Sequence, residues 1–316
     1  LVRSRGLGDV YKRQLEEGHW PWKIDKELNT VSFENYGGSL TTSMTAHPKI
    51  CPKTGELLAF SYFSFEPPYL TYLRISPDGQ LLQSEGIDIP KMVMMHDFNV
   101  TENYVVFMDL PAVFDMQLAM SGDMPIRWDD DYPARLGLMP RTGSNQDVNW
   151  FEINPCYIFH PMNAYEEKNR IVLDVARYDH IWRDSTMDFP SPMLWRITID
   201  TESGKVSEEQ IDDMPAEFPR VADSVVGLKH RYGYMVSLSD NDDPDDMLNT
   251  SSSILKYDCQ SGQRNEIDLG AGCIGGEPVF VPSSNSETED DGYLFTYVFD
   301  ANIAVSYTHL TLPTKA

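Results

Sequence analysis

Short runs of apolar and aromatic residues, separated by turn motifs, recur along the whole 316-residue chain. The predicted strands are 57–65, 69–76, 80–85, 104–110, 171–178, 194–200, 232–238, 254–257, 278–282 and 293–300. Between them lie turn-forming clusters at 77–79, 201–204, 239–244 and 260–262. No stretch offers a sustained apolar helical face with caps at both ends. Many short strands with regular turns predict an all-β sandwich, barrel or propeller.

The two ends differ in character from the rest of the chain. Residues 1–14 are basic within an acidic protein, and residues 305–316 break the preceding strand pattern. Both resemble translated adapter sequence, which carries no information about the native fold. We expect 1–14 and 305–316 to be non-native and 15–304 to be an internal fragment forming one domain.

Charge and cysteine content narrow the function classes. The chain has 49 acidic against 25 basic side chains, a net charge of −24. Nucleic acid is therefore an unsuitable partner, because binding phosphates needs clustered Lys and Arg. Four cysteines without a CxxC pair predict reduced thiols and a cytoplasmic location. No apolar run is long enough to span a membrane. We also expect the protein to be a monomer.

Three histidines have short, similar contexts beside predicted strands. They are His47 in Thr-Ala-His-Pro-Lys, His96 in Met-Met-His-Asp-Phe and His160 in Ile-Phe-His-Pro-Met. His47 and His160 precede proline, which favours an extended backbone at a strand end. Any one alone is best interpreted as a hydrogen-bonded structural histidine. Together, at spacings near one propeller blade, they predict imidazoles converging on an axial metal.

A histidine that binds a metal usually has its second ring nitrogen tied to an acceptor such as a carboxylate. Glu17, Glu217 and Glu277 lie in apolar or turn-like settings and could supply it. On its own, each of them would be interpreted as a surface carboxylate.

These residues belong to stretches that resemble the carotenoid cleavage oxygenase family, which includes the vertebrate retinoid isomerase and stilbene-cleaving dioxygenases. The matching stretches run in family order and cover essentially all of 15–304. They are Thr45–Lys49, Pro67–Tyr72, Met95–Thr101, Pro155–Tyr165, Glu217–Arg220, Glu277–Pro282 and Glu289–Tyr293.

The resemblance implies a seven-bladed β-propeller, incomplete here at both ends, with a ferrous iron on its axis. The family binds iron through four histidines, three of them hydrogen-bonded to glutamates. His47, His96 and His160 match the first three ligands. Glu17, Glu217 and Glu277 match the glutamates, with Glu17 expected to orient His96 and Glu217 to orient His160. The implied substrates are dioxygen and an apolar carotenoid or apocarotenoid, cleaved at a conjugated double bond.

The chain departs from the family at the fourth ligand, which belongs downstream of residue 304. His309 lies in the suspect tail without the family context, and His19, His180 and His230 match no ligand motif. We therefore expect Glu277 to lack its histidine and this fragment to be inactive as an enzyme.

Two other functions remain open at this point. A stilbene-cleaving relative would typically have lysine just before Glu17, where this chain has Glu16. A metal-free binding propeller would leave the three histidines unrelated in space. Segments 65–72 and 92–95 suit either tunnel lining or core packing. Segment 113–120 suits either a membrane-contacting patch or a packed loop.

Overall fold

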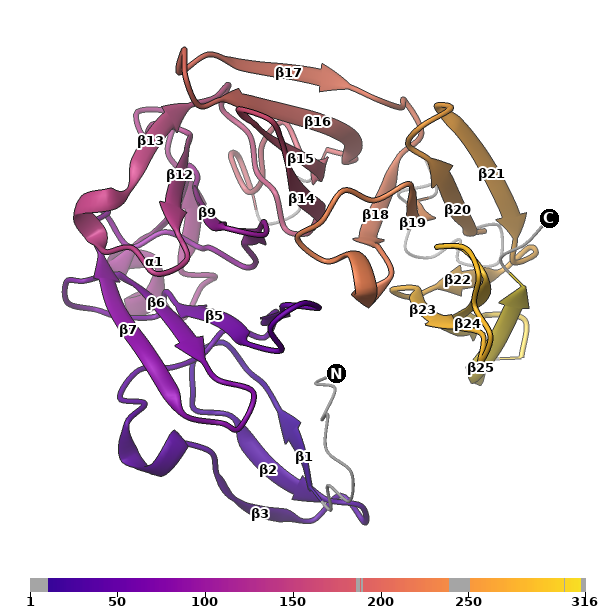
Figure 1. The fold of residues 1–316 in the computed structure, drawn as a ribbon, viewed down its shortest axis with the longest axis horizontal. Helices are drawn as coiled ribbons and strands as arrows, with labels where there is room; N and C mark the ends of the chain where they lie inside the picture. The colour runs from indigo at the N-terminus through magenta and orange to yellow at the C-terminus, as the bar shows by residue number, and fades with distance from the viewer. Residues whose placement is uncertain (1–10, 186–187, 189, 239–250, 304, 314–316) are drawn as a thin grey trace. The chain divides into compact units, whose positions relative to one another are not determined.

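The computed structural model describes residues 11–185, 188, 190–238, 251–303 and 305–313. The chain divides into two compact units, residues 1–98 with 104–150 (unit 1) and 99–103 with 151–316 (unit 2). In the described ranges the regular structure is almost entirely antiparallel β, as Figure 1 shows. The exceptions are the helix α1 (Met116–Ser121) and the 3-10 turns η1 (Tyr36–Gly38), η2 (Asn145–Asp147) and η3 (Asp223–Val225).

Unit 1 contains three blade-type sheets and a separate hairpin. The first sheet is β1 (Tyr11–Gln14), β2 (Trp22–Asp25) and β3 (Thr30–Phe33), and the second is β4 (Lys49–Ile50), β5 (Leu57–Ser61), β6 (Leu70–Ile75) and β7 (Leu81–Ile87). The third is centred on β9 (Tyr104–Asp109) paired with β12 (Arg135–Pro140). The hairpin is β10 (Ala112–Phe114) with β11 (Ile126–Trp128). Strand β8 (Asn99–Val100) falls in segment 99–103, and β13 (Asn149–Glu152) spans the boundary at 150/151.

Unit 2 also contains three sheets, each built from consecutive strands. The first is β14 (Pro161–Glu167), β15 (Arg170–Arg177), β16 (Met193–Asp200) and β17 (Val206–Gln210). The second is β18 (Ala216–Arg220), β19 (Tyr232–Ser237), β20 (Ser253–Asp258) and β21 (Gln263–Asp268). In the third, β24 (Gly292–Asp300) pairs with β22 (Cys273–Gly275), β23 (Val279–Pro282) and β25 (Val305–Pro313).

Burial changes from strand to strand within a sheet. All five residues of β5 are buried, whereas β7 is only partly buried and has exposed residues along it. A strand flanked by others on both sides and covered on both faces needs a continuous apolar sequence, while an outer strand needs only one apolar face. The core of the first two sheets of unit 1 is packed from Tyr36, Leu40, Met44, Leu57, Ala59, Leu73 and Ile75.

The prediction of an all-β fold is confirmed, but the number of blades is wrong. Each of the ten predicted strands coincides with an observed strand, displaced by a few residues at most. Three sheets in each unit make six blades of a propeller-type fold among the described residues, not the seven that the resemblance implied. The two-stranded hairpin of β10 and β11 is separate from these blades.

Several sequence expectations fall at the margins of the described structure. The turn expected at 239–244 lies outside the described residues. Strands β1 and β25 fall largely in the stretches expected to be non-native, so the proposed 15–304 boundaries stay a prediction. All four cysteines are free thiols. No helix in the described ranges combines the length and apolar character needed to cross a membrane.

Candidate metal centre

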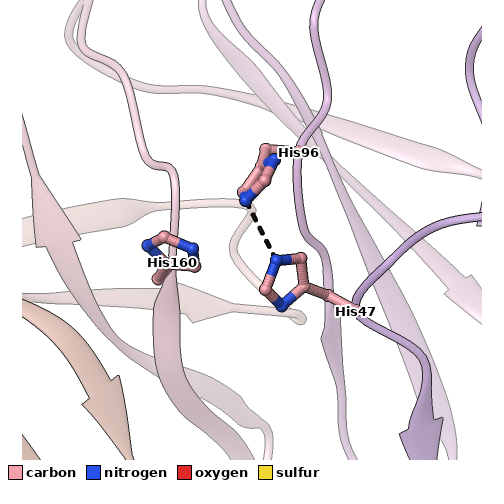
Figure 2. A group of neighbouring side chains, drawn as sticks. All are labelled: His47, His96 and His160. Carbon is pink, nitrogen blue, oxygen red and sulfur yellow. Dashed lines mark hydrogen bonds between the residues drawn. The ribbon is translucent and has the colours of Figure 1, made fainter. Parts of the chain in front are cut away.

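In unit 1, the side chains of His47 and His96 face each other. Their Nε2 atoms lie 2.9 Å apart (Figure 2). His47 stands just before β4 and His96 just before the end of unit 1's first segment, so short strand-flanking segments position both rings. Two nitrogens about 2.1 Å from one metal ion and at right angles to each other lie about 3 Å apart. The separation of the two rings therefore fits two neighbouring ligands of a single ion.

Glu17 holds the other side of the His96 ring. Its Oε1 lies 2.5 Å from His96 Nδ1, and the two side chains are 19% and 22% exposed. A carboxylate oxygen only accepts hydrogen bonds, so this placement favours the tautomer with the proton on Nδ1, which leaves the Nε2 lone pair for a metal.

His47 has a different environment on its far side. Its Nδ1 lies 3.9 Å from Oδ2 of Asp97, a carboxylate whose side chain is 3% exposed. Lys49 compensates that charge, with Nζ 2.7 Å from Asp97 Oδ1. The backbone N–H of His47 donates to Thr45 Oγ1 at 3.0 Å, which fixes the turn that carries the ring. The Asp97–Lys49 ion pair thus lies beside His47 in the way that Glu17 lies beside His96, but at a longer distance.

In unit 2, His160 repeats the arrangement of His96. Its Nδ1 lies 3.0 Å from Oε2 of Glu217, whose side chain is 4% exposed. His160 directly precedes β14, and Glu217 is the second residue of β18. Nδ1 is again the donor to a carboxylate, so the lone pair lies on Nε2. Aromatic rings of Phe159 and Phe218 flank the imidazole, with centroids 6.3 and 5.3 Å from it.

Phe218, the residue after Glu217, has a positive φ of 55°. The register of β18 with β19 shifts between Glu217 and Arg220, so the strand bulges here. This bend brings the Phe218 N–H onto Oε2 of Glu217, which also faces His160. A β-bulge re-aims a side chain in this way next to functional sites.

Glu277 differs from the other two glutamates. Its Oε1 accepts from Nη1 of Arg220 at 3.0 Å, and its side chain is 38% exposed. Of the remaining histidines, His19 lies 2.6 Å from Glu16, His180 lies 3.1 Å from Asp188, and His230 lies 3.4 Å from Asp174. His309 lies on β25, whose side chains fall outside the described residues.

A second group in unit 2, Asp174, His230 and Cys259, also has a donor set that could suit a metal. His230 Nε2 lies 3.4 Å from Asp174 Oδ2 and 3.6 Å from Cys259 Sγ. The Nδ2 group of Asn163 lies 3.2 Å from His230 Nδ1 and donates at shorter distances to the backbone oxygens of Leu228 and Val225, at 2.9 and 3.1 Å. Arg196 already binds both oxygens of Asp174, at 2.7 and 3.0 Å. These contacts describe a neutral, hydrogen-bonded histidine.

Burial in this second group disfavours charge. It lowers the pKa of His230, against the opposing effect of Asp174. It also raises the pKa of the Cys259 thiol to about 12. The protonated thiol is a poor metal ligand near neutral pH, whereas the imidazole stays neutral.

Comparison with known proteins identifies the family. The model of the retinal pigment epithelial membrane protein family matches residues 13–311. The chain belongs to this family, which is that of the carotenoid cleavage oxygenases. A "Carotenoid cleavage oxygenase" of Mycobacterium tuberculosis is 35% identical over 90% of this chain and 66% of its own length. A "Carotenoid 9,10(9',10')-cleavage dioxygenase 1" of Phaseolus vulgaris is 34% identical over 94% of this chain and 58% of its own.

Solved structures agree with that assignment. The lignostilbene dioxygenase of Pseudomonas brassicacearum superposes with a TM-score of 0.86 at 28% identity, covering 97% of this chain and 68% of that one. Cobalt-substituted Synechocystis ACO gives a TM-score of 0.85 at 27% identity, covering 96% and 67%. The chain spans less than two thirds of the length of the curated relatives named above, at 66% and 58%.

Proposed function

We propose that the chain is the metal-binding part of a non-haem iron dioxygenase that cleaves a conjugated carbon–carbon double bond in a carotenoid or apocarotenoid. The observation that carries the proposal is the Nε2–Nε2 distance of 2.9 Å between His47 and His96, with the His96 Nδ1 held by Glu17. Membership of a family whose relatives are named carotenoid cleavage enzymes supports the choice of substrate.

His160 is the third ligand in this proposal. In its sequence context, Ile-Phe-His-Pro-Met, it matches the third metal-binding histidine of the family. Its Nδ1 is held by Glu217 just as that of His96 is held by Glu17. An all-imidazole, neutral donor set suits ferrous iron. Glu277, paired with Arg220, is assigned no ligand to orient within the described residues.

The protein's contribution to the reaction is positioning. Bound iron would supply the dioxygen chemistry. Glu17 and Glu217 keep the Nδ1 protons in place, which directs the Nε2 lone pairs of His96 and His160 to the metal. The aromatic side chains of Phe159 and Phe218 beside His160 exclude water and offer apolar surface to a polyene.

The test is anaerobic loading of a full-length version of the protein with Fe(II), followed by aeration in the presence of an apocarotenal. We expect bound iron near one equivalent and aldehyde products detectable by chromatography and mass spectrometry. His96→Ala is the matched negative control, since it removes a ligand and leaves the blade sheets intact. Bound iron without any aldehyde would contradict the proposed reaction.

A stilbene-cleaving activity is the second candidate, supported by similarity to a lignostilbene dioxygenase. The residue before Glu17 argues against it. Glu16 places a carboxylate there, bound to His19 at 2.6 Å and to the Gly18 N–H at 3.0 Å, where a phenolate would need a cation. Turnover of resveratrol exceeding that of apocarotenal in parallel assays would favour the stilbene reaction.

We also propose peripheral membrane contact through an apolar patch of unit 1, formed by the exposed Phe63, Phe65, Met116 and Met120 and the half-buried Phe114. Three of its rings are in contact, with centroids 5.8 Å apart for Phe63–Phe65 and 5.5 Å apart for Phe65–Phe114. Met120 on α1 is 82% exposed and Phe65 is 61% exposed. A contiguous exposed apolar surface of this kind suits insertion among lipid headgroups.

Co-sedimentation with phosphatidylcholine liposomes tests this contact. Neutral lipid is suitable because the chain carries a net charge of −24. We expect Phe114→Asp to reduce the bound fraction, while Leu82→Asp, at an exposed leucine on β7, leaves it unchanged. Equal binding by both variants would rule the patch out. A cytoplasmic location and a monomeric state stay predictions.

A further inference from the structure

In each unit, a tyrosine hydroxyl binds the same glutamate that holds the histidine. In unit 1, Tyr62 donates from its hydroxyl to Oε2 of Glu17, while Oε1 of that glutamate faces His96 Nδ1 at 2.5 Å. In unit 2, Tyr178 donates to Oε1 of Glu217 at 3.2 Å, while Oε2 faces His160 Nδ1 at 3.0 Å. The same order of groups, hydroxyl to carboxylate to imidazole, is therefore built twice.

Both tyrosines occupy equivalent places in their sheets. Tyr62 directly follows β5, and Tyr178 directly follows β15, each the second strand of a four-stranded sheet. Both are buried, at 6% and 7% exposure. The Tyr178 backbone is fixed further by reciprocal hydrogen bonds with Tyr157 at 2.8 and 2.9 Å. The hydroxyl positions are thus set by the sheets.

A carboxylate that accepts from a tyrosine with one oxygen and faces an imidazole with the other has less freedom to rotate about its last side-chain bond. If Glu17 or Glu217 rotated, the acceptor for the Nδ1 proton would move, and the imidazole could tilt with it. Burial, followed by the charge of Glu217, raises the pKa of Tyr178, so its hydroxyl stays protonated and remains a donor.

We infer that Tyr62 and Tyr178 are positioning residues for the metal ligands, acting through Glu17 on His96 and through Glu217 on His160. The inference rests on the proposed function, because it presumes that these histidines bind the metal. It adds a third layer of residues to that site, outside the ligands and their glutamates.

The experiment compares Tyr62→Phe and Tyr178→Phe with two matched controls. Tyr72 and Tyr234 are buried tyrosines, one in each unit, at 0% and 1% exposure. Among the described residues, neither of their hydroxyls has a hydrogen-bond partner. Tyr72→Phe and Tyr234→Phe therefore remove a buried hydroxyl without touching a glutamate.

Two properties of the 316-residue chain are measured with Co(II) as the probe. The first is the dissociation constant, from titration against a competing chelator. The second is the solvent exchange rate of the paramagnetically shifted histidine Nδ1 protons in the cobalt-loaded protein. We expect Tyr62→Phe and Tyr178→Phe to bind cobalt about three- to tenfold more weakly, less than the ~10–100-fold for loss of a direct outer partner. One Nδ1 proton should exchange faster in each variant, and both controls should stay within about twofold of the unmodified chain.

Each outcome decides a different point. Affinity and exchange rates equal to those of the controls would overturn the inference. A variant that lowers the melting temperature of the metal-free protein but leaves Nδ1 exchange unchanged would show a purely structural tyrosine, which also overturns it. If the unmodified chain itself binds no cobalt, the proposed metal site fails, and the tyrosine assignment fails with it for that separate reason.

Discussion

Histidines in this protein face carboxylates in two contrasting ways, one found at His96 and at His160 and the other at His230. At His96 and at His160 a glutamate oxygen faces Nδ1, which favours the tautomer with the proton on Nδ1 and leaves the Nε2 lone pair available for a metal. At His230 the Asn163 amide faces Nδ1, and Asp174 lies 3.4 Å from Nε2. The comparison teaches that proximity of suitable donor atoms does not make a metal site. The proton on each ring nitrogen, set by its neighbours, decides.

The largest effect we expect is the loss of stability when Arg196 is removed. Its guanidinium binds both oxygens of Asp174, the carboxylate beside His230. Arg196→Met leaves Asp174, 2% exposed, without the guanidinium that binds both its oxygens. Removing one partner of a buried pair costs about 3–5 kcal/mol of unfolding free energy. Urea denaturation measures it. The control Arg231→Met breaks an exposed pair with Asp258 and should cost far less. Equal losses would mean that the Asp174 group is not a buried structural unit.

Removal of the histidines themselves tests which group binds metal. His96→Ala should weaken Co(II) binding by more than about 100-fold, because loss of an outer partner alone costs about 10–100-fold. His230→Ala should leave the affinity unchanged within about twofold, although it destabilises the fold. Chelator competition gives both values. Stronger dependence on His230 than on His96 would reverse the comparison.

The glutamates provide a finer test. Glu217→Gln replaces an acceptor of the His160 Nδ1 proton by an amide and should weaken Co(II) binding about 10–100-fold. Glu277→Gln should change it little in this chain, since Arg220 is the partner of Glu277. The same titration serves for both. Similar losses in the two variants would show that Glu277 also supports a ligand.

The smallest expected effect is the pH dependence of stability from His230. Burial lowers its pKa in the folded protein below the usual 6.5. The unfolded chain therefore takes up this proton first as the pH falls, so stability is full above about pH 6.5 and declines below it, by at most about 1.4 kcal/mol per pH unit. Urea unfolding between pH 7.5 and 5 should show a shallower decline for His230→Gln. An unchanged slope would mean that folding does not lower the pKa of His230.

The sequence predicted most of the inner strands because their burial leaves a strong apolar signal, although the buried strands β12 and β14 were missed. Strands β17 and β21 were missed, since their sequences Val-Ser-Glu-Glu-Gln and Gln-Arg-Asn-Glu-Ile-Asp are largely polar and exposed. They form because β16 and β20 offer them a pairing edge. That information lies in the neighbouring strand and not in the segment itself.

The residues of the candidate site were likewise only partly predictable from the sequence. The histidines and glutamates stand in distinctive local contexts, and the structure places Glu17 beside His96 and Glu217 beside His160. Tyr62 and Tyr178 were missed because their partners lie 45 and 39 residues away in the sequence. Their one local signal is position, since each directly follows the second strand of its sheet.

The left-handed backbone at Phe218 sets a limit on how this protein can be made more stable. A non-glycine residue in that conformation costs about 1–2 kcal/mol, so Phe218→Gly is an obvious choice for thermostabilisation. Yet the same bend aims Glu217 at His160. A flexible glycine would let the Glu217 carboxylate adopt other orientations. Selection for heat resistance alone would therefore lower the metal affinity of the chain.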